Sequence, residues 1–501
     1  MQALSHKLIK SFNSYPERNA FYIKGVYYSY LDIASRIIRI QNALGRTDPD
    51  KKLVGIVAYD VPDTYCAIIA TLLTGNTFVP INPKNPKDRN NAIIRQAGLK
   101  YVITGNDKTE SDPVLDTTGL TVISGSELPQ GRPEMTSTGA AGRDAAYLLF
   151  TSGTTGIPKG VPITYGNLQS FIDGFFALGY RISPEDRFLQ MFDLSFDLSV
   201  MSYLIPLCAG ACVYTVPHEG ILYTHIYDLL ENRGITFALM VPSVLAHLRP
   251  YFGEIRLEKM RYSLFCGEAL YEDITDEWAQ CVPNAIVHNV YGPTEATIFC
   301  LAYNRKRDIP MKSFNGIVCI GKPMKHVKAV VVNEKHRPVP VGVKGELCIG
   351  GGQTTPGYWN DVEKNKEAFF ELNGASYYKT GDIAFSDDEG DFYFVGRMDQ
   401  QVKVQGGYRV ELSEIEHCAR EFLPAGNVAA VSLDTGTGIP AIYLAVENHY
   451  GELSSLREYL RKKLPYYMIP AKILSFKEFP LNVNGKTDRK KIEEMIRTTH
   501  K

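Results

Sequence analysis

Residues 151–160, Thr-Ser-Gly-Thr-Thr-Gly-Ile-Pro-Lys-Gly, combine hydroxyls, glycines and one lysine directly after an apolar stretch. Glycine permits backbone angles that a β-carbon forbids, so successive N–H groups can converge on an anion. Lys159 adds a positive charge, and its proline and glycine neighbours distinguish the segment from a Walker A loop. The hydroxyl donors are Thr151, Ser152, Thr154 and Thr155. We predict a polyphosphate-binding loop at the end of a buried strand, with an ordinary surface turn as the alternative.

Three further segments carry side chains suited to nucleotide chemistry. In Asn-Val-Tyr-Gly-Pro-Thr-Glu, Tyr291 offers a stacking face for an aromatic base and Thr294 offers a phosphate donor. Glu295 supplies a hard carboxylate of the kind that binds Mg²⁺. Asp382 could hold both hydroxyls of a ribose, and Lys486 lies on a tight Asn-Gly turn. Each segment alone could also be a turn with solvated charges.

A framework of strands and helices must position these segments. A strand at 53–58 and a helix at 61–73 begin an alternation that resumes after the loop, for example with a helix at 167–178. Alternating strands and helices predict parallel α/β units. Residues 105–142 are polar and are expected to be loop, whereas short strands with Gly/Pro turns from about 316 to 397 predict a small β-barrel or sheet.

A new alternating unit begins near residue 399. We place a domain boundary between Met398 and Asp399, which divides the chain into domains of residues 1–398 and 399–501. Arg397 lies at this expected joint. The elements predicted after it are a helix at 411–422, strands at 427–433 and 441–446, and a helix at 456–463.

Length and composition limit the function. A chain of 501 residues is too long for one core and predicts at least two domains. The net charge of −1 argues against a nucleic-acid surface, and no apolar run approaches the roughly 20 residues that span a bilayer. The odd number of cysteines, 9, with no CxxC pair, fits buried thiols in a reducing compartment. We expect a cytoplasmic protein without a signal peptide.

The order and wording of these segments resemble the adenylate-forming enzymes: acyl-CoA synthetases, luciferases and peptide-synthetase adenylation domains. From Tyr28 onward, nearly the whole chain is similar to an amino-acid adenylation domain. Further matching segments are Thr-Phe-Val-Pro-Ile-Asn-Pro at 77–83, Phe-Asp-Leu-Ser at 196–199, Gly-Glu-Leu at 345–347, Val-Glu-Leu-Ser-Glu-Ile-Glu at 410–416 and Leu-Pro-Tyr-Tyr-Met-Ile-Pro at 464–470.

This resemblance implies a mixed α/β fold, in which two α/β subdomains and a small β-barrel form a large N-terminal domain hinged to a small α+β C-terminal domain. It also implies ATP and Mg²⁺ as cofactors and a two-step reaction. A carboxylate first attacks the α-phosphate of ATP, giving an acyl-adenylate and pyrophosphate. A thiol then displaces AMP. The first step requires charge neutralisation at an in-line phosphoryl centre.

By position, the resemblance assigns roles to individual residues. It implies phosphate contacts from the 151–160 loop, a catalytic role for Lys486 and for Thr294 at the α-phosphate, Mg²⁺ at Glu295, and a hinge at Asp399. Adenine is expected to contact Gly267, Glu268, Asn289 and Tyr291. The ribose is expected to contact Asp382 and Arg397. After step one, Lys486 would leave as the small domain rotates and brings residues 403–409 toward the site.

Asp197 lies where adenylation domains for α-amino acids carry the carboxylate that pairs with the substrate ammonium. A buried carboxylate needs such a partner, because an unpaired buried charge is costly. The alternative is a helix N-cap. The other expected pocket residues are Leu198, Met201, Leu239, Leu264, Cys266, Val290, Ile298 and Phe299. Several are bulky, so we expect a small amino acid.

Cys266 before Gly-Glu, with Phe-Asp-Leu-Ser-Val-Met earlier, is similar to the D-alanine–D-alanyl carrier protein ligases. D-Alanine is therefore the first expectation, with glycine, L-alanine or serine open, while a catalytic cysteine is the rival interpretation of Cys266. Because the chain ends 15 residues beyond Lys486, a phosphopantetheine carrier protein acting in trans is the expected acceptor. An acid–CoA ligase and an adenylate-binding protein without catalysis are the other candidates.

One departure from the family concerns the loop after the expected hinge. Relatives carry Lys-x-x-Gly-Tyr-Arg, whereas this chain has Lys-Val-Gln-Gly-Gly-Tyr-Arg at 403–409. We expect a local bulge to absorb the extra Gly407. Its effect on the thioester step is open.

Overall fold

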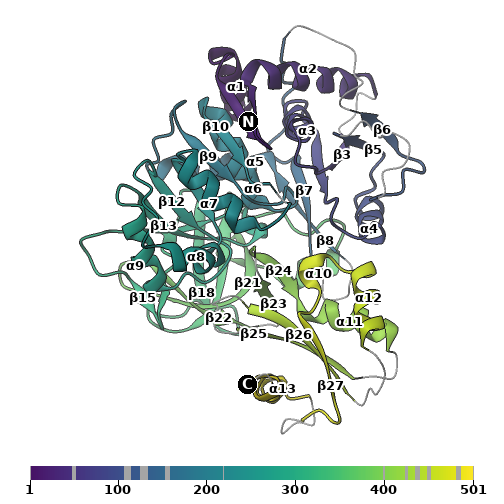
Figure 1. Cartoon of the computed structure of the whole chain (residues 1–501), viewed down its shortest axis with the longest axis vertical. Coiled ribbons are helices and arrows are strands. Elements are labelled where there is room, and N and C mark those ends of the chain that lie inside the picture. The colour runs from purple at the N-terminus through teal and green to yellow at the C-terminus, as the bar shows by residue number, and fades with distance from the viewer. Residues whose placement is uncertain are drawn as a thin grey trace.

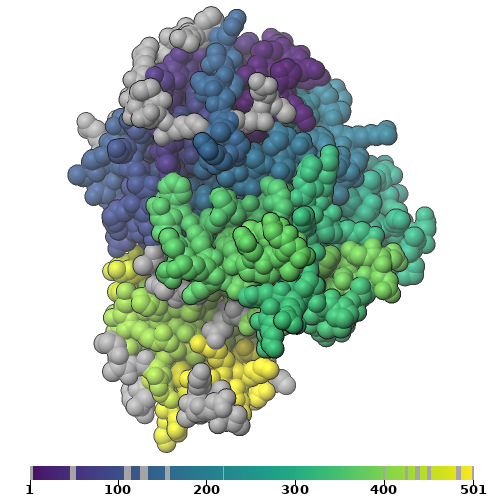
Figure 2. All heavy atoms as spheres, turned by 180° about the vertical axis from the view of Figure 1, so that it is seen from behind, coloured from purple at the N-terminus to yellow at the C-terminus, as the bar shows by residue number. Residues whose placement is uncertain are grey.

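The structure is a computed structural model of the chain. It describes residues 2–47, 52–105, 114–124, 134–152, 158–217, 219–398, 401–404, 406–423, 427–434, 440–447, 453–480 and 487–499. Figure 1 shows an elongated molecule with α1 and α2 at one end and α13 at the other. In Figure 2 the C-terminal residues, lime to yellow, gather at one end beside the larger body formed by the rest of the chain.

The first sheet carries the predicted phosphate loop at one edge. Its strand order in the described ranges is β6-β5-β3-β4-β7-β8, and all neighbours are parallel except β7 and β8. The strands are β3 (Leu53–Val57), β4 (Thr77–Ile81), β5 (Tyr101–Thr104), β6 (Thr121–Ser124), β7 (Ala145–Thr151) and β8 (Lys159–Thr164). Accompanying helices are α2 (Tyr30–Thr47), α3 (Pro62–Leu73) and α4 (Lys87–Ala97). Every residue of α3 is buried, in agreement with its mostly apolar sequence, and its one charged residue, Asp63, pairs with Arg36 at 2.8 Å.

The second sheet, β17-β14-β13-β12-β11-β9-β10-β1-β2, is parallel from β13 to β1 and antiparallel at both ends. Its strands are β1 (Asn19–Ile23), β2 (Val26–Ser29), β9 (Arg187–Gln190), β10 (Cys212–Thr215), β11 (Phe237–Met240), β12 (Tyr262–Phe265), β13 (Ile286–Tyr291), β14 (Leu301–Arg305) and β17 (Lys322–Pro323). The helices of this region are α1 (Gln2–Ser14), α5 (Tyr165–Ala177), α6 (Asp197–Ala209), α7 (Leu222–Asn232), α8 (Pro242–Leu248) and α9 (Glu272–Cys281). One large apolar cluster joins both sheets.

A small antiparallel sheet occupies the region predicted as a barrel or sheet. Its order is β18-β19-β21-β20, with β22 also paired to β21. These strands are β18 (Val327–Val332), β19 (Gly345–Gly351), β20 (Phe369–Leu372), β21 (Ala375–Ser386) and β22 (Phe392–Arg397). Other short elements are η1 (Arg249–Tyr251), which directly follows α8, η2 (Thr294–Ala296), β15 (Ser313–Phe314), β16 (Ile317–Val318) and α10 (Val362–Ala368).

The C-terminal part, from Gln401 onward, has its own apolar clusters. It consists of a hairpin, β23 (Gln401–Val404) with β24 (Tyr408–Glu411), and a sheet of order β25-β26-β27. The remaining elements are α11 (Leu412–Phe422), β25 (Val428–Asp434), β26 (Pro440–Glu447), α12 (Ser454–Lys463), η3 (Tyr466–Met468), β27 (Lys472–Phe476) and α13 (Arg489–Thr499).

Buried polar contacts join the C-terminal part to the rest of the protein. Arg89 on α4 lies 2.6 Å from Glu414 on α11, and both side chains are almost fully buried. The hydroxyl of Tyr408 donates to the carboxylate of Asp193. These contacts belong to one relative orientation of the two parts, since each needs a side chain from both.

The mixed α/β architecture agrees with the prediction, and the helices near 61–73, 167–178, 411–422 and 456–463 are confirmed with small shifts at their ends. One prediction was incomplete, because β6 lies within the 105–142 stretch expected to be loop. The boundary between residues 398 and 399 stays a prediction, since residues 399–400 lie outside the described ranges. No helix in the described ranges is long and apolar enough to cross a membrane.

Candidate active site

The predicted phosphate loop joins two paired strands. Thr151 ends β7 and lies opposite Lys159, which begins β8. Thr154 and Thr155 lie outside the described residues. The Thr151 hydroxyl is buried and has no hydrogen-bond partner within the described part of the chain, so it can serve a ligand oxygen. Ser152 instead donates to the backbone carbonyl of Arg409, at 3.0 Å.

Lys159 faces the C-terminal part. Its ammonium lies 3.5 Å from Glu411 at the end of β24, and both side chains are largely buried. Burial lowers the pKa of Lys159, and the Glu411 carboxylate opposes this effect. The positive charge predicted for the loop is therefore held beside an acidic group from the small C-terminal hairpin.

Glu295, the predicted metal ligand, lies on η2 and is fully buried. Its carboxylate accepts hydrogen bonds from Nη1 of Arg409, at 3.1 and 2.9 Å, and from the hydroxyl of Tyr358, at 2.7 Å. Burial acts to raise the pKa of Glu295, but the Arg409 charge and these hydrogen bonds bring it below its ordinary value. Glu295 therefore stays ionised inside the protein.

The predicted ribose residues meet across a strand pair. Asp382 on β21 lies opposite Arg397 on β22, and Arg397 Nη1 lies 2.7 Å from Asp382 Oδ1. The hydroxyl of Tyr291 donates to the same carboxylate. Together with Asn289 and Glu268, these side chains line a cavity of about 230 Å³.

Three of the predicted adenine residues, Glu268, Asn289 and Tyr291, line this cavity, and Gly267 directly precedes Glu268. Gly267 has a left-handed backbone with φ of +95°, which favours glycine. Glu268 accepts hydrogen bonds from the backbone and hydroxyl of Ser243, at 2.7 and 3.0 Å, and from Gly407 N, at 3.1 Å. Burial raises the pKa of Glu268 to about 7. The Asn289 amide donates to two backbone carbonyls, at 3.1 and 3.0 Å, which fixes its orientation.

Asp197 is the first residue of α6 and is buried. Its Oδ2 accepts a hydrogen bond from Ile298 N at 3.1 Å, and burial raises its pKa to about 7, with Glu295 adding to the effect. The N-cap of α6 is Phe196, and no side chain caps it, so the N-cap alternative for Asp197 is wrong. A ligand with an ammonium group would compensate the buried carboxylate.

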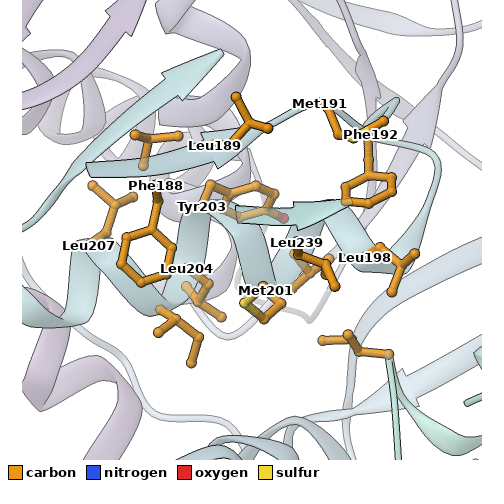
Figure 3. Packing of buried hydrophobic residues seen from close by; sticks show 14 of the residues in the cluster. Phe188, Leu189, Met191, Phe192, Leu198, Met201, Tyr203, Leu204, Leu207 and Leu239 are labelled. Carbon is orange, nitrogen blue, oxygen red and sulfur yellow. The ribbon is translucent and has the colours of Figure 1, made fainter. Parts of the chain in front are cut away.

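The other predicted pocket residues are all buried and come from several elements. Leu239 on β11 pairs in register with Leu264 on β12, and Figure 3 shows Leu239 in one packed cluster with Leu198 and Met201. The remaining members are Cys266, Val290, Ile298 and Phe299. Burial raises the pKa of Cys266 to about 12, which keeps its thiol protonated and argues against a nucleophile.

The extra Gly407 lies in the turn between β23 and β24. The strand register continues without interruption to Val404 opposite Tyr408, so the extra residue is accommodated locally in the turn and not within either strand. Gly406 and Gly407 have φ of +87° and +74°, and a β-carbon on Gly407 would lie 2.9 Å from Val241. The turn therefore needs glycine for both its backbone angles and its close packing.

Two predicted residues, Lys486 and Asp399, lie outside the described residues. The elements before and after Lys486, β27 and α13, lie toward the lower end of the C-terminal part in Figure 1, away from the β23–β24 hairpin. Sequence reasoning missed Tyr358 and the pairing of Arg409 with Glu295. The sequence signal for this pairing was Arg409 itself, because residues 403–409 were already expected to approach the site.

Together the fold and site define a class: an α/β protein with a buried carboxylate and arginine site covered by a small C-terminal part. Residues 8–359 match the family described as AMP-binding enzyme. The chain therefore belongs to the family of AMP-binding enzymes.

Relatives and solved structures agree with this class. The chain is 30% identical over 497 residues to tyrocidine synthase 1 of Brevibacillus parabrevis, a match that covers 96% of this chain but only 44% of that protein. It is 28% identical to D-alanine--D-alanyl carrier protein ligase of Bacillus licheniformis, over 98% of this chain and 99% of that one. The family resemblance drawn from the motifs is thus confirmed.

The fold matches that of the Vibrio cholerae adenylation domain AlmE in complex with glycyl-adenosine-5'-phosphate. The TM-score is 0.87 at 24% identity, covering 99% of this chain and 98% of that one. The crystal structure of IdnL7 matches with a TM-score of 0.72 at 28% identity, covering 99% of both chains.

Proposed function

We propose that this protein activates a small α-amino acid with ATP and transfers it to the phosphopantetheine thiol of a separate carrier protein. The amino-acid carboxylate attacks the α-phosphate and pyrophosphate leaves. The thiol sulfur then attacks the acyl carbon, its proton is released, and AMP leaves. D-Alanine is the first candidate, because a D-alanine carrier protein ligase matches over nearly its whole length.

One observation carries the proposal: the buried Asp197 carboxylate lies beside the segment that also holds Thr294 and Glu295. An ammonium bound at Asp197 would leave the carboxylate of the same small molecule directed toward the phosphate side. A fatty or aryl acid has no group to compensate Asp197. The arrangement therefore supports an α-amino acid.

In the first step, the loop at 151–160 would bind the phosphates, and the Thr151 hydroxyl, which has no partner among the described residues, suits a phosphate oxygen. Asp382 and Arg397 would orient the ribose, and Tyr291 would stack on adenine. Lys486 would bridge the substrate carboxylate and the α-phosphate after rotation about Asp399. The domains 1–398 and 399–501 are proposed to move as units in this rotation.

Mg²⁺, when bound, would neutralise phosphate charge. Glu295 suits it as a hard oxygen ligand. In the described residues both oxygens of Glu295 contact Arg409, so a cation bound there would be repelled by the guanidinium charge, and we propose that Arg409 moves away before the ion binds. No group of three or more acidic, histidine or cysteine side chains in the described ranges forms another metal site. We assign the ion to Glu295 together with the substrate phosphates.

In the second step, the thiol needs a path to the adenylate. A cleft of about 1580 Å³ lies between the C-terminal part and the rest of the protein, lined by Phe196, Ser243, Gly406 and Tyr408 among others. We assign this cleft to the pantetheine arm. The orientation seen in the structure, with Arg409 inside the site, would then be the one that forms the thioester.

Exchange of labelled pyrophosphate into ATP tests the first step directly. The panel is D-alanine, L-alanine, glycine, serine, and fatty and aryl acids, with enzyme lacking added acid as the control. We expect dominant exchange with D-alanine, followed by labelling of a holo carrier protein but not of free coenzyme A. Exchange only with acids that lack an amine would refute the role of Asp197 and favour an acid–CoA ligase. Dominant exchange with glycine would replace D-alanine by glycine as the proposed substrate and leave the proposed reaction unchanged.

A further inference from the structure

A strained turn borders the proposed amino-acid pocket. Thr297 and Ile298, directly after η2, have φ of +58° and +70°. Both are β-branched, and such residues rarely adopt left-handed backbone angles. Consecutive residues in this conformation persist only where the surroundings hold them.

Gln353, just after β19, supplies that restraint. Its side chain is fully buried, and Nε2 lies 2.8 Å from the carbonyl oxygen of Phe299 and 3.2 Å from those of Ala296 and Thr297. One amide group thus contacts carbonyls before, within and after the strained residues.

The contact is reciprocal and extends to neighbouring backbone. The Thr297 hydroxyl donates to the carbonyl oxygen of Gln353 at 2.5 Å. Two residues further on, Thr355 N donates to the carbonyl oxygen of Glu295 at 2.8 Å. Residues 353–355 therefore fix the turn from Glu295 to Phe299 along its length.

The held conformation determines what the turn presents to the pocket. It directs Ile298 N–H to Oδ2 of Asp197, at 3.1 Å, while the Ile298 and Phe299 side chains are buried. A relaxed turn would withdraw this donor and move two pocket residues together. The adenine and ribose residues Tyr291 and Asp382 are held by separate contacts.

We propose that Gln353 is a positioning residue for amino-acid binding, which acts by holding the 296–299 turn against Asp197. This inference rests on the proposed function and adds to it a residue outside the pocket. The inference treats binding of the amino acid and binding of the nucleotide as separate. Loss of the Gln353 amide should weaken amino-acid binding and leave nucleotide binding unchanged.

The test compares Gln353→Met with Gln41→Met. Gln41 is also buried, and its amide donates to a backbone carbonyl, that of Thr136, at 2.7 Å, remote from the pocket. In pyrophosphate exchange, Gln353→Met should raise the KM for the amino acid about tenfold and leave the KM for ATP within about twofold, because only the turn loses its hydrogen bonds. Gln41→Met should lower the melting temperature and change neither KM.

Thr297→Val provides a second, isosteric variant in case Gln353→Met does not fold. It removes the hydroxyl contact to Gln353 and should raise the KM for the amino acid in the same direction. A folded Gln353→Met or Thr297→Val variant with an unchanged amino-acid KM would overturn the inference, as would an equal rise in both KM values. If the wild-type protein shows no amino-acid-dependent exchange, the proposed function itself fails.

Discussion

Nη1 of Arg409 lies 3.1 Å from Oε1 and 2.9 Å from Oε2 of Glu295, although 114 residues separate them in sequence. The pair joins the β23–β24 hairpin to the predicted metal ligand. A metal ion at the same oxygens would lie close to the guanidinium of Arg409, and the two positive charges would repel each other. The two steps of the proposed reaction would therefore use Glu295 with different cationic partners.

Replacing Arg409 should separate these steps. Arg409→Gln removes the charge that faces Glu295 only in the described orientation, and an unpaired buried carboxylate costs about 3–5 kcal/mol. We expect pyrophosphate exchange to stay within about threefold, while single-turnover thioester formation falls at least about tenfold. Equal losses of pyrophosphate exchange and of thioester formation would contradict a role for Arg409 in the second step alone.

Lys486→Ala should abolish adenylate formation, because no other cation is proposed to bridge the substrate carboxylate and the α-phosphate. ATP binding should persist, since the proposed contacts to adenine and ribose lie elsewhere. Calorimetric titration with ATP and pyrophosphate exchange measure the two properties. Turnover close to that of the wild-type protein in this variant would refute the assignment.

Asp197 should make amino-acid binding depend on pH. Its pKa is raised to about 7 by burial, so in the free protein the carboxylate is mostly protonated below that value. An ammonium ligand binds the ionised form, and the KM for the amino acid should therefore fall as pH rises from about 5.5 to 7.5. Asp197→Asn should have a much higher KM without this pH dependence. The negative charge of Glu295 also raises the pKa of Asp197, and Glu295 itself stays ionised in this pH range.

The raised pKa of Asp197 also makes the free energy of unfolding depend on pH. Because the folded pKa of Asp197 lies above its ordinary value, the folded protein binds more protons than the unfolded chain between about pH 4 and 7, and stability falls with rising pH there. The stability advantage of Asp197→Asn should grow over this window to at most about 4 kcal/mol. Denaturant unfolding at several pH values measures it, and a gap independent of pH would contradict the buried carboxylate.

Arg89 and Glu414 should favour the described orientation. Arg89→Met removes their buried ion pair and should slow thioester formation several-fold while pyrophosphate exchange persists. The matched control is Lys463→Met, because Lys463 at the end of α12 and Asp88 on α4 form an exposed pair of 3.9 Å that also joins α4 to the C-terminal part. Exposed pairs contribute little, so the control should match the wild-type protein in both assays. Identical behaviour of the two variants would argue against a role for Arg89.

Periodicity and turn residues were enough to predict most of the parallel strands but only some of the helices that accompany them, such as those near 61–73 and 167–178. They failed at α4, whose segment Lys-Asp-Arg-Asn-Asn-Ala-Ile-Ile-Arg-Gln-Ala is mostly polar, although Arg89 and Asn90 are buried. Those side chains bind partners far away in sequence. Apolar spacing carries no information about such burial.

The candidate site, too, could be predicted only in part from the sequence. The family motifs implied that Tyr291, Asp382 and Arg397 serve one nucleotide, and their side chains do lie together, although their roles stay predictions. The restraint by Gln353 could not be predicted, since it depends on one buried amide meeting carbonyls more than 50 residues earlier in the chain. Nothing in its local sequence distinguishes it from a glutamine in an ordinary turn.

Three of the ion pairs that join the C-terminal part to the rest are buried: Arg89 with Glu414, Arg409 with Glu295 and Lys159 with Glu411. The exposed pair of Lys463 with Asp88 contributes little. Dissolved ions screen exposed charges over about 10 Å at 0.1 M but reach buried pairs poorly. The balance between the two orientations should therefore be nearly insensitive to ionic strength. Protons and bound substrates act directly on the same carboxylates. We therefore expect pH and substrate binding, not salt, to shift the balance between the two orientations.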